Sequence, residues 1–100
     1  MHRYVFLFLF LVPALAWALP DDATLSKMLI GHWFSDRHEY VYRKDGTWIC
    51  PEDEWSGTWR IKNGKLITTF KGHEGRTETI IELTNTTLET DAQRLTRSHN

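Results

Sequence analysis

Hydrophobic residues are distributed in two different ways along the chain. Residues 4–15 form an apolar run that only Pro13 interrupts, whereas apolar and polar residues alternate in short segments over most of the sequence after Gly31. Alternation with a period of two is typical of β-strands that have one buried face and one solvated face. We therefore expect an N-terminal apolar segment followed by a β-rich domain.

The apolar run has the features of a secretory signal peptide. Arg3 gives it a basic start, and Ala16 and Ala18 supply small residues at the two positions that a signal peptidase reads. The run is shorter than the roughly 20 residues of a membrane-spanning helix. We predict cleavage after Ala18, which separates a signal peptide (residues 1–18) from one secreted or periplasmic domain (residues 19–100) without a membrane anchor.

One short helix is predicted at the start of this domain. Leu25, Met28 and Leu29 fall at positions i, i+3 and i+4, which places them on one apolar helical face. Gly31 follows at the point where the end of a helix requires a left-handed residue. No comparable helical spacing recurs in the sequence beyond Gly31, so we expect the remaining elements to be strands.

Asn63-Gly64 is the strongest hairpin signal in the sequence. Both central residues of a type I′ turn need positive φ, which Asn and Gly tolerate. This turn pairs Ile61 with Leu66 across the hairpin and sorts the side chains into a core face and a mostly wet face. The predicted core face carries Trp59, Ile61, Leu66, Thr68 and Phe70.

A second hairpin is predicted around residues 44–46. A three-residue loop with its glycine in the left-handed conformation places Tyr42 opposite Trp48. The same register places Tyr40 opposite Cys50. A two-residue loop would shift the register by one residue. We favour the three-residue loop because it gathers the aromatic rings on one face.

Short alternating segments continue to the end of the chain. In the segment that ends at Leu83, uninterrupted alternation places Ile81 on the same face of the strand as Leu83. It places Ile80 on the opposite face. About eight strands are enough to close a small barrel. We therefore predict an all-β fold, a small up-and-down antiparallel β-barrel with a short N-terminal helix. The predicted strands lie near Trp33 and at residues 39–43, 47–50, 57–62, 65–70, 77–83, 87–91 and 94–97.

Composition narrows the class of protein. The chain has 12 basic and 13 acidic residues and a formal net charge of −1, which argues against the electropositive face of a nucleic-acid-binding protein. A charged fraction of 25% beside 13% aromatic residues argues against disorder. The lone Cys50 excludes an internal disulfide and a multi-cysteine zinc site. We therefore expect burial of the aromatic rings to stabilise the fold.

Four motifs carry a family resemblance. They are LIGHW at residues 29–33, YRKDGTW at 42–48, GTWRIKNGKLI at 57–67 and IIELTNTTL at 80–88. These motifs resemble the small secreted lipocalin-like (calycin-type) proteins of bacteria, which implies a β-barrel with a binding role. The resemblance also implies that Trp33 closes the barrel floor. Arg97 or Arg94 would lie across its ring in a cation–π contact.

Aromatic residues supply the candidate binding site. Small eight-stranded barrels either fill their interior with side chains or hold one small ligand, and both interpretations apply to Trp33, Trp48 and Trp59. Trp55 lies in an acidic segment and is either folded over the barrel mouth or exposed as an anchor for a partner. We expect Trp55 and the loop at residues 71–76 to rim the mouth. The candidate ligand-binding residues are Trp55, Trp48, Tyr42, Tyr40, Trp59 and His73.

Catalytic and metal-binding signatures are not evident in the sequence. No Ser or Cys lies in a nucleophile elbow, and the histidines lack the spacing of zinc ligands. The acids at residues 52–54 are contiguous and lack the spacing of a calcium loop. Cys50 is either buried and inert or exposed for an intermolecular disulfide. We predict a non-enzymatic protein without catalytic residues, metal or cofactor.

Two functions fit these observations. The first is a binding protein for a small apolar or aromatic ligand. The second is a protein-interaction module, an inhibitor or accessory factor of a secreted or envelope protein that uses loop residues on a rigid, filled barrel. A connected cavity in the barrel interior favours the first function, and an interior filled by the Trp side chains favours the second.

Overall fold

The computed structural model describes residues 19–71 and 73–97 of the chain. The predicted signal peptide at residues 1–18, together with its predicted cleavage site, lies outside these residues. Within the two described ranges, no helix has the length and apolar character needed to cross a membrane.

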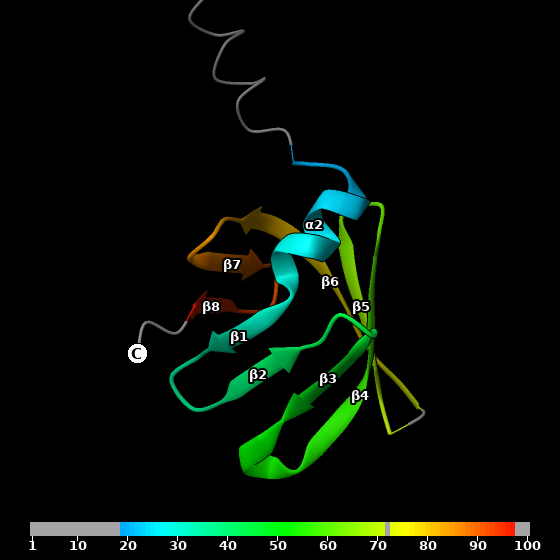
Figure 1. Ribbon diagram of the computed structural model, residues 1–100, viewed down its shortest axis with the longest axis vertical. Helices are drawn as coiled ribbons and strands as arrows, with labels where there is room; N and C mark the ends of the chain where they lie inside the picture. The colour runs from blue at the N-terminus through cyan, green and yellow to red at the C-terminus, as the bar shows by residue number, and fades with distance from the viewer. Residues whose placement is uncertain (1–18, 72, 98–100) are drawn as a thin grey trace, which may run out of the picture.

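Eight antiparallel strands form a closed barrel in this part of the chain (Figure 1). Each strand pairs with the next in sequence, and the last pairs with the first. The predicted small up-and-down barrel with a short N-terminal helix is confirmed. The elements are the helix α2 (Asp22–Leu29), the strands β1 (Gly31–Phe34), β2 (Glu39–Tyr42), β3 (Thr47–Cys50), β4 (Trp55–Lys62), β5 (Lys65–Phe70), β6 (His73–Leu83), β7 (Thr87–Thr90) and β8 (Arg94–Arg97), and the 3₁₀ turn η1 (Pro51–Asp53).

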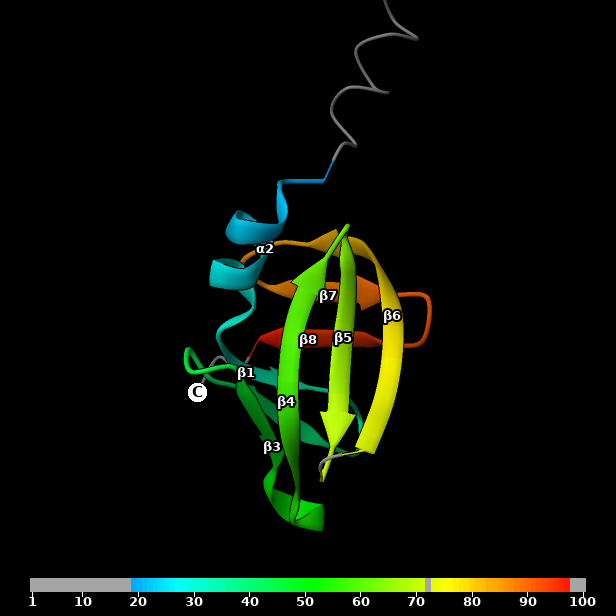
Figure 2. The ribbon, with the colours of Figure 1, turned by 90° about the vertical axis from the view of Figure 1, so that its right-hand side faces the viewer.

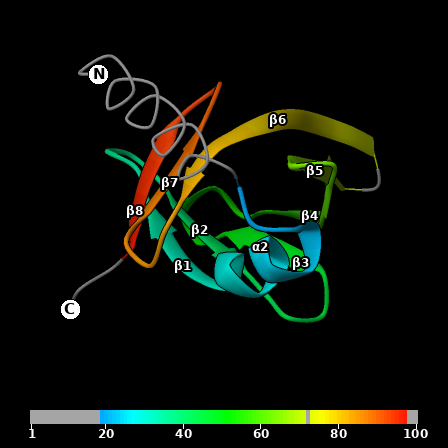
Figure 3. The ribbon, with the colours of Figure 1, turned by 90° about the horizontal axis from the view of Figure 1, so that it is seen from above.

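Helix α2 covers one end of the barrel (Figures 1 and 3). Its predicted apolar face is buried, because Leu25 and Leu29 are both inaccessible to solvent. The Asp22 carboxylate accepts hydrogen bonds from the backbone N–H groups of Asn63 and Gly64 at 2.7 and 2.9 Å. The start of the helix is therefore attached to the β4–β5 turn, and this end of the barrel is closed.

The two predicted hairpin turns are present. Asn63 and Gly64 have φ of 54° and 72°, and Ile61 pairs with Leu66 as expected from a type I′ turn.

In the other hairpin Tyr42 pairs with Trp48, which confirms the three-residue loop. The β2–β3 ladder ends one residue pair later, so the predicted pairing of Tyr40 with Cys50 is not part of it. The chain turns into η1 directly after Cys50.

A bulge in β6 changes the predicted alternation. Ile80 pairs with Thr90 and Glu82 pairs with Glu89, which leaves Ile81 as an extra residue between them. Ile80 and Leu83 are therefore both buried, and Ile81 is exposed. The prediction that Ile81 and Leu83 share a face was wrong, because a bulge inserts one residue and reverses the faces beyond it.

Two strands begin earlier than the sequence pattern predicted. β4 starts at Trp55, which pairs with Cys50, because η1 and a left-handed Glu54 (φ 56°) shorten the connection from β3 to four residues. β6 starts at His73, which pairs with Phe70 across a short turn. Trp55 and residues 73–76 are therefore strand residues. The prediction of a loop over residues 71–76 was wrong, because β6 already begins at His73.

Trp33 closes the barrel beneath α2. Its indole Nε1 donates a 2.8 Å hydrogen bond to the Leu29 carbonyl, and the Arg97 guanidinium lies 3.9 Å from the centre of its ring. Arg97 also donates to the carbonyls of Met28 and Ile30. A Cβ at Gly31 (φ +132°) would lie only 2.3 Å from Arg97 Nη1. The cation–π contact implied for Arg97 or Arg94 is therefore made by Arg97. Only glycine at position 31 leaves room for the guanidinium in this place.

The barrel interior contains the aromatic and aliphatic core. Its rings point inward, as expected for a domain that buries its aromatic side chains. The buried apolar cluster consists of Leu25, Leu29, Trp33, Tyr42, Trp48, Cys50, Trp59, Leu66, Ile80, Leu83, Leu88 and Leu95.

The up-and-down topology gives the barrel two different ends. Alternate connections lie at the same end, so the β2–β3, β4–β5 and β6–β7 turns lie with α2. The β1–β2, β3–β4, β5–β6 and β7–β8 turns lie at the opposite end, which no α-helix of the described residues covers. Figure 2 shows α2 and the β4–β5 turn at one end, and η1 and the β5–β6 turn at the other. We call the second the open end.

Candidate ligand-binding site

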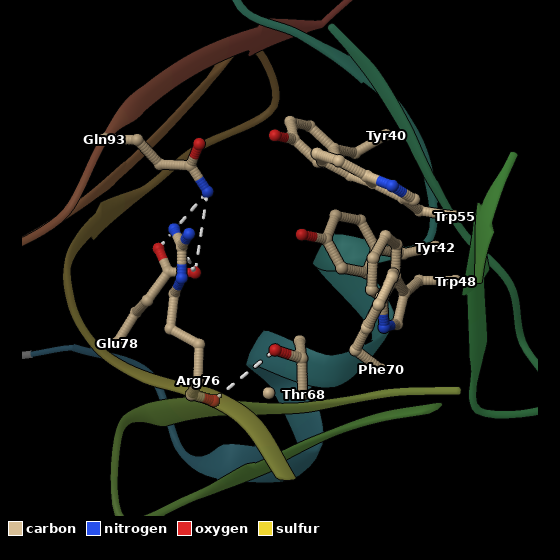
Figure 4. A pocket seen from close by; sticks show the side chains of 10 residues that line it. Tyr40, Tyr42, Trp48, Trp55, Thr68, Phe70, Arg76, Glu78 and Gln93 are labelled. Carbon is tan, nitrogen blue, oxygen red and sulfur yellow. Dashed lines mark hydrogen bonds and ion pairs between the residues drawn. The ribbon is translucent and has the colours of Figure 1, made fainter. Parts of the chain in front are cut away.

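A cavity of about 350 Å³ lies in the barrel near the open end. Strands from opposite sides of the barrel supply two chemically different walls (Figure 4). Thr68 of β5 and Gly75 of β6 line the cavity between these walls. The volume falls within the range of about 300–1,000 Å³ of small-molecule sites.

The first wall, which we call the aromatic wall, comes from four consecutive strands. Trp48 and Phe70 stack with their ring centres 6.4 Å apart, and Trp55 meets Phe70 edge-on at 5.9 Å. Alternate inward positions on β2 and single positions on β3, β4 and β5 bring these rings together. The aromatic wall consists of Tyr40, Tyr42, Trp48, Trp55 and Phe70.

Gly57 allows Trp48 to take its place in the aromatic wall. The Trp48 indole crosses β4 and donates a 2.8 Å hydrogen bond from Nε1 to the carbonyl of Thr69 on β5. A Cβ at Gly57 would lie 1.9 Å from this carbonyl oxygen and 2.9 Å from Nε1. Any larger residue at position 57 would displace the indole, so the glycine fixes the orientation of the ring.

The second wall, which we call the polar wall, consists of Arg76, Glu78 and Gln93. Glu78 is only 3% exposed. Its carboxylate accepts hydrogen bonds from Thr90 Oγ1 at 2.6 Å and from Gln93 Nε2 at 3.3 Å. The Arg76 guanidinium is 3.8 Å from the same carboxylate and is more than half exposed. The polar wall therefore presents both donors and acceptors to the cavity.

Two phenol groups point from the aromatic wall toward the polar wall. Figure 4 shows the hydroxyl groups of Tyr40 and Tyr42 directed into the cavity. Neither hydroxyl has a hydrogen-bond partner among the residues that the structure describes. Burial raises the pKa of Tyr42, and the nearby Glu78 carboxylate adds to the rise. Burial also raises the pKa of Tyr40. Both groups therefore remain protonated at neutral pH and are available as hydrogen-bond donors.

A group of three polar side chains lies beside the cavity, at its rim. His38 stacks on Trp55 with the ring centres 5.7 Å apart, and its Nε2 is 2.9 Å from Asp53 Oδ2. Cys50 is fully buried, and its thiol lies 3.7 Å from the same Asp53 oxygen. We call His38, Cys50 and Asp53 the rim cluster.

Burial decides between the two alternatives for Cys50. It raises the pKa of the thiol to about 11, with a further contribution from the hydrogen bond to Glu52. A buried, protonated thiol is neither an activated nucleophile nor accessible to another chain. The alternative of an exposed Cys50 that forms an intermolecular disulfide does not fit this position.

Comparison with known proteins agrees with this architecture. The family model described as "Lipocalin-like domain" matches residues 30–90 of the chain. The chain belongs to the lipocalin-like domain family. Neither a curated protein nor a solved structure matches the chain. A lipocalin-like domain is in general a binding fold and not a catalytic one.

The lipocalin-like barrel brings four of the six candidate site residues to the cavity. Tyr40, Tyr42, Trp48 and Trp55 line it, whereas Trp59 and His73 do not. Trp59 is buried nearer the helix end, where its indole donates to the carbonyl of Arg43 at 3.0 Å. The side chain of His73 is exposed at the start of β6. Trp59 therefore fills the interior, while Trp48 and Trp55 face the cavity.

Other lining residues were missed by the sequence analysis. Phe70 was predicted to lie on the core face of its hairpin but was not included among the candidate ligand-binding residues. The alternation of apolar residues in this hairpin was therefore a signal that could have identified it. Arg76 and Glu78 alternate along β6 with the same period as Ile80, so all three side chains point into the barrel. The bulge at Ile81 concealed from the sequence pattern which face of this strand is the inner one. Gln93 lies in the β7–β8 turn, and no local pattern distinguishes it from an ordinary turn residue.

Proposed function

We propose that this lipocalin-like protein is an exported, non-enzymatic binding protein for a small, flat aromatic or apolar molecule that carries a polar group. In this proposal residues 1–18 are removed as a signal peptide and residues 19–100 form the working domain. The observation that carries the proposal is the cavity between the aromatic wall and the polar wall.

The aromatic wall favours a planar, apolar part of the ligand. Rings that stack or meet edge-on contribute about 0.5–1.5 kcal/mol each beyond the area that they bury. Trp48 is held in place by its hydrogen bond to Thr69, so its ring is already oriented before a ligand binds. Ligand binding therefore loses little conformational entropy in this part of the wall.

The polar wall favours a hydrogen-bonding group at the opposite side of the ligand. Glu78 and Gln93 are fixed by their mutual hydrogen bond and by Thr90. A ligand donor is expected to meet Glu78, and a ligand acceptor is expected to meet Arg76 or one of the two Tyr hydroxyl groups. These groups orient the ligand, because an unpaired polar group in this cavity loses its water without gaining a partner.

Replacing Trp55 by alanine is expected to weaken ligand binding at least about tenfold, because it removes one face of the aromatic wall. Trp55 is 38% exposed, so the fold should tolerate its loss. The measurement is a fluorescence titration of the purified protein with anilinonaphthalene sulfonate and with neutral and cationic aromatic dyes. The wild-type protein is expected to show saturable quenching of Trp fluorescence.

The matched control is Ile81→Ala, which removes an exposed apolar side chain from the outer face of the barrel. This variant should bind the dyes as the wild type does. Equal affinity of the wild type and Trp55→Ala for every dye would contradict the proposed site. A complete lack of saturable binding would contradict the proposed function and favour the alternative, a protein-interaction module that uses Trp55 as an anchor.

A further inference from the structure

We propose that the rim cluster of His38, Cys50 and Asp53 is a binding site for a divalent transition-metal ion such as Zn²⁺. The cluster offers one nitrogen, one sulfur and one oxygen atom, all within 4.8 Å of one another. It is separate from the cavity, although Trp55 contacts both. The proposal therefore does not depend on the proposed small-molecule function.

Two separations within the rim cluster are near those of a shared metal ion. Zinc lies about 2.3 Å from sulfur and about 2.0–2.2 Å from nitrogen and oxygen, so two ligands of a tetrahedral ion are about 3.4–3.6 Å apart. The Cys50 Sγ and Asp53 Oδ2 atoms are 3.7 Å apart, and His38 Nε2 is 2.9 Å from the same oxygen. The third separation, between Cys50 Sγ and His38 Nε2, lies within 4.8 Å.

The backbone fixes each of the three side chains before an ion binds. Cys50 ends β3, and Pro51 starts the 3₁₀ turn that brings Asp53 back over the thiol. His38 lies in the β1–β2 turn, where its N–H donates to Ser35 Oγ at 3.0 Å and its carbonyl accepts from the Ser35 N–H at 2.9 Å. Two turns at the open end thus present the three ligand atoms to one point, which lowers the entropy cost of binding.

The rim cluster is closed toward the core and open toward solvent. Cys50 is fully buried and forms its floor, whereas the side chains of His38 and Asp53 are 30% and 35% exposed. We therefore expect an ion to reach the thiol from this exposed side. Glu52 Oε1, 3.6 Å from the thiol, adds negative charge beside the site.

The ligand types select the class of ion. Calcium and magnesium prefer oxygen ligands only, whereas a thiolate with an imidazole and a carboxylate suits Zn²⁺ and related transition-metal ions. When the ion binds, it takes the place of the protons on the Cys50 thiol and on His38 Nε2. The thiol proton passes to the solvent, and the Nε2 proton is lost to the solvent or replaced by one on Nδ1. No electron transfer is involved.

A second His–carboxylate pair on the same hairpin provides an internal comparison. His32 Nδ1 is 2.6 Å from Glu39 Oε2 on the outer surface of the barrel. Among the residues that the structure describes, this pair belongs to no comparable group of three metal-ligating side chains. The His32 pair is thus an ordinary surface hydrogen-bonded pair, and the rim cluster differs from it by the buried thiol.

The experiment uses Co²⁺ as a spectroscopic probe of the purified protein, followed by displacement with Zn²⁺. We expect a near-ultraviolet charge-transfer band from the bond between thiolate and Co²⁺, together with the visible bands of a four-coordinate site. His38→Gln and Asp53→Asn should each weaken Co²⁺ binding by more than about 100-fold, because loss of a direct ligand exceeds the effect known for outer-shell partners. His32→Gln should bind as the wild type does.

Cys50→Ala should abolish the charge-transfer band. Cys50 is buried, so its replacement can affect folding as well as metal binding. The test of the metal site therefore relies on the variants of His38 and Asp53, whose side chains are partly exposed. The proposal is overturned if the wild type shows no charge-transfer band, or if His38→Gln and Asp53→Asn bind Co²⁺ as tightly as the wild type. The dye titration is scored separately, so failure of the metal site leaves the result on the cavity unaffected.

Discussion

Replacing Trp33 by alanine is expected to lower the free energy of unfolding by about 3–5 kcal/mol, the range of large-to-small changes at buried aromatic positions. Trp33 is fully buried, and the Arg97 guanidinium packs 3.9 Å from the centre of its ring. The variant leaves a cavity under α2, removes the hydrogen bond to Leu29 and deprives Arg97 of its cation–π contact. Chemical denaturation followed by circular dichroism measures the loss.

Trp33→Phe separates these contributions. It keeps an aromatic ring for Arg97 and removes the indole N–H, so its expected cost is smaller and includes about 1 kcal/mol for the lost hydrogen bond. A destabilisation of less than about 1 kcal/mol for Trp33→Ala would show that the ring does not close the barrel.

Trp59→Ala is also expected to cost about 3–5 kcal/mol of unfolding free energy. Trp59 is buried, meets Tyr42 edge-on with the ring centres 6.0 Å apart, and donates from its indole N–H to the Arg43 carbonyl at 3.0 Å. Its loss should leave the cavity at the open end in place, because Trp59 does not line it. Denaturation and dye titration of the same variant test both statements.

Arg60→Ala is the matched control for Trp59→Ala. Arg60 is the next residue on β4 and is exposed on the opposite face. Surface changes of this kind usually alter stability by less than about 0.5 kcal/mol. If Trp59→Ala were as mild as Arg60→Ala, the assignment of the inner and outer faces of the β4–β5 hairpin would be refuted.

Much of the fold could be predicted because its determinants are local in sequence. The Asn63-Gly64 turn fixes the register of a whole hairpin by the φ angles that its two residues tolerate. The left-handed Gly46 similarly fixes the pairing of Tyr42 with Trp48. Once these two registers are set, alternation alone decides which rings face inward.

The polar half of the site could not be predicted, because its determinants are not local. A bulge at Ile81 reverses the faces of β6, and the sequence has no signal for it. Glu78 is buried only because Thr90 and Gln93, which are 12 and 15 residues away, supply its hydrogen bonds. Such a network exists only after the barrel has closed.

The rim cluster escaped prediction for the same reason. His38 lies in the β1–β2 turn, whereas Cys50 ends β3 and Asp53 ends the following turn η1, so their spacing matches no metal-binding motif. The up-and-down topology places both turns at the open end and brings the three side chains together. A search for spacing motifs therefore does not detect ligand atoms that the fold brings together from two separate turns.

The central claim is that the cavity between the aromatic wall and the polar wall binds a small aromatic ligand. Proton–nitrogen correlation spectra of the labelled protein, recorded during titration with a bound dye, test it most directly because each tryptophan gives its own indole N–H signal. The signals of Trp48 and Trp55 are predicted to shift saturably, while those of Trp33 and Trp59 stay in place. Shifts confined to Trp33 and Trp59, or no indole shift at saturating dye, would contradict the account.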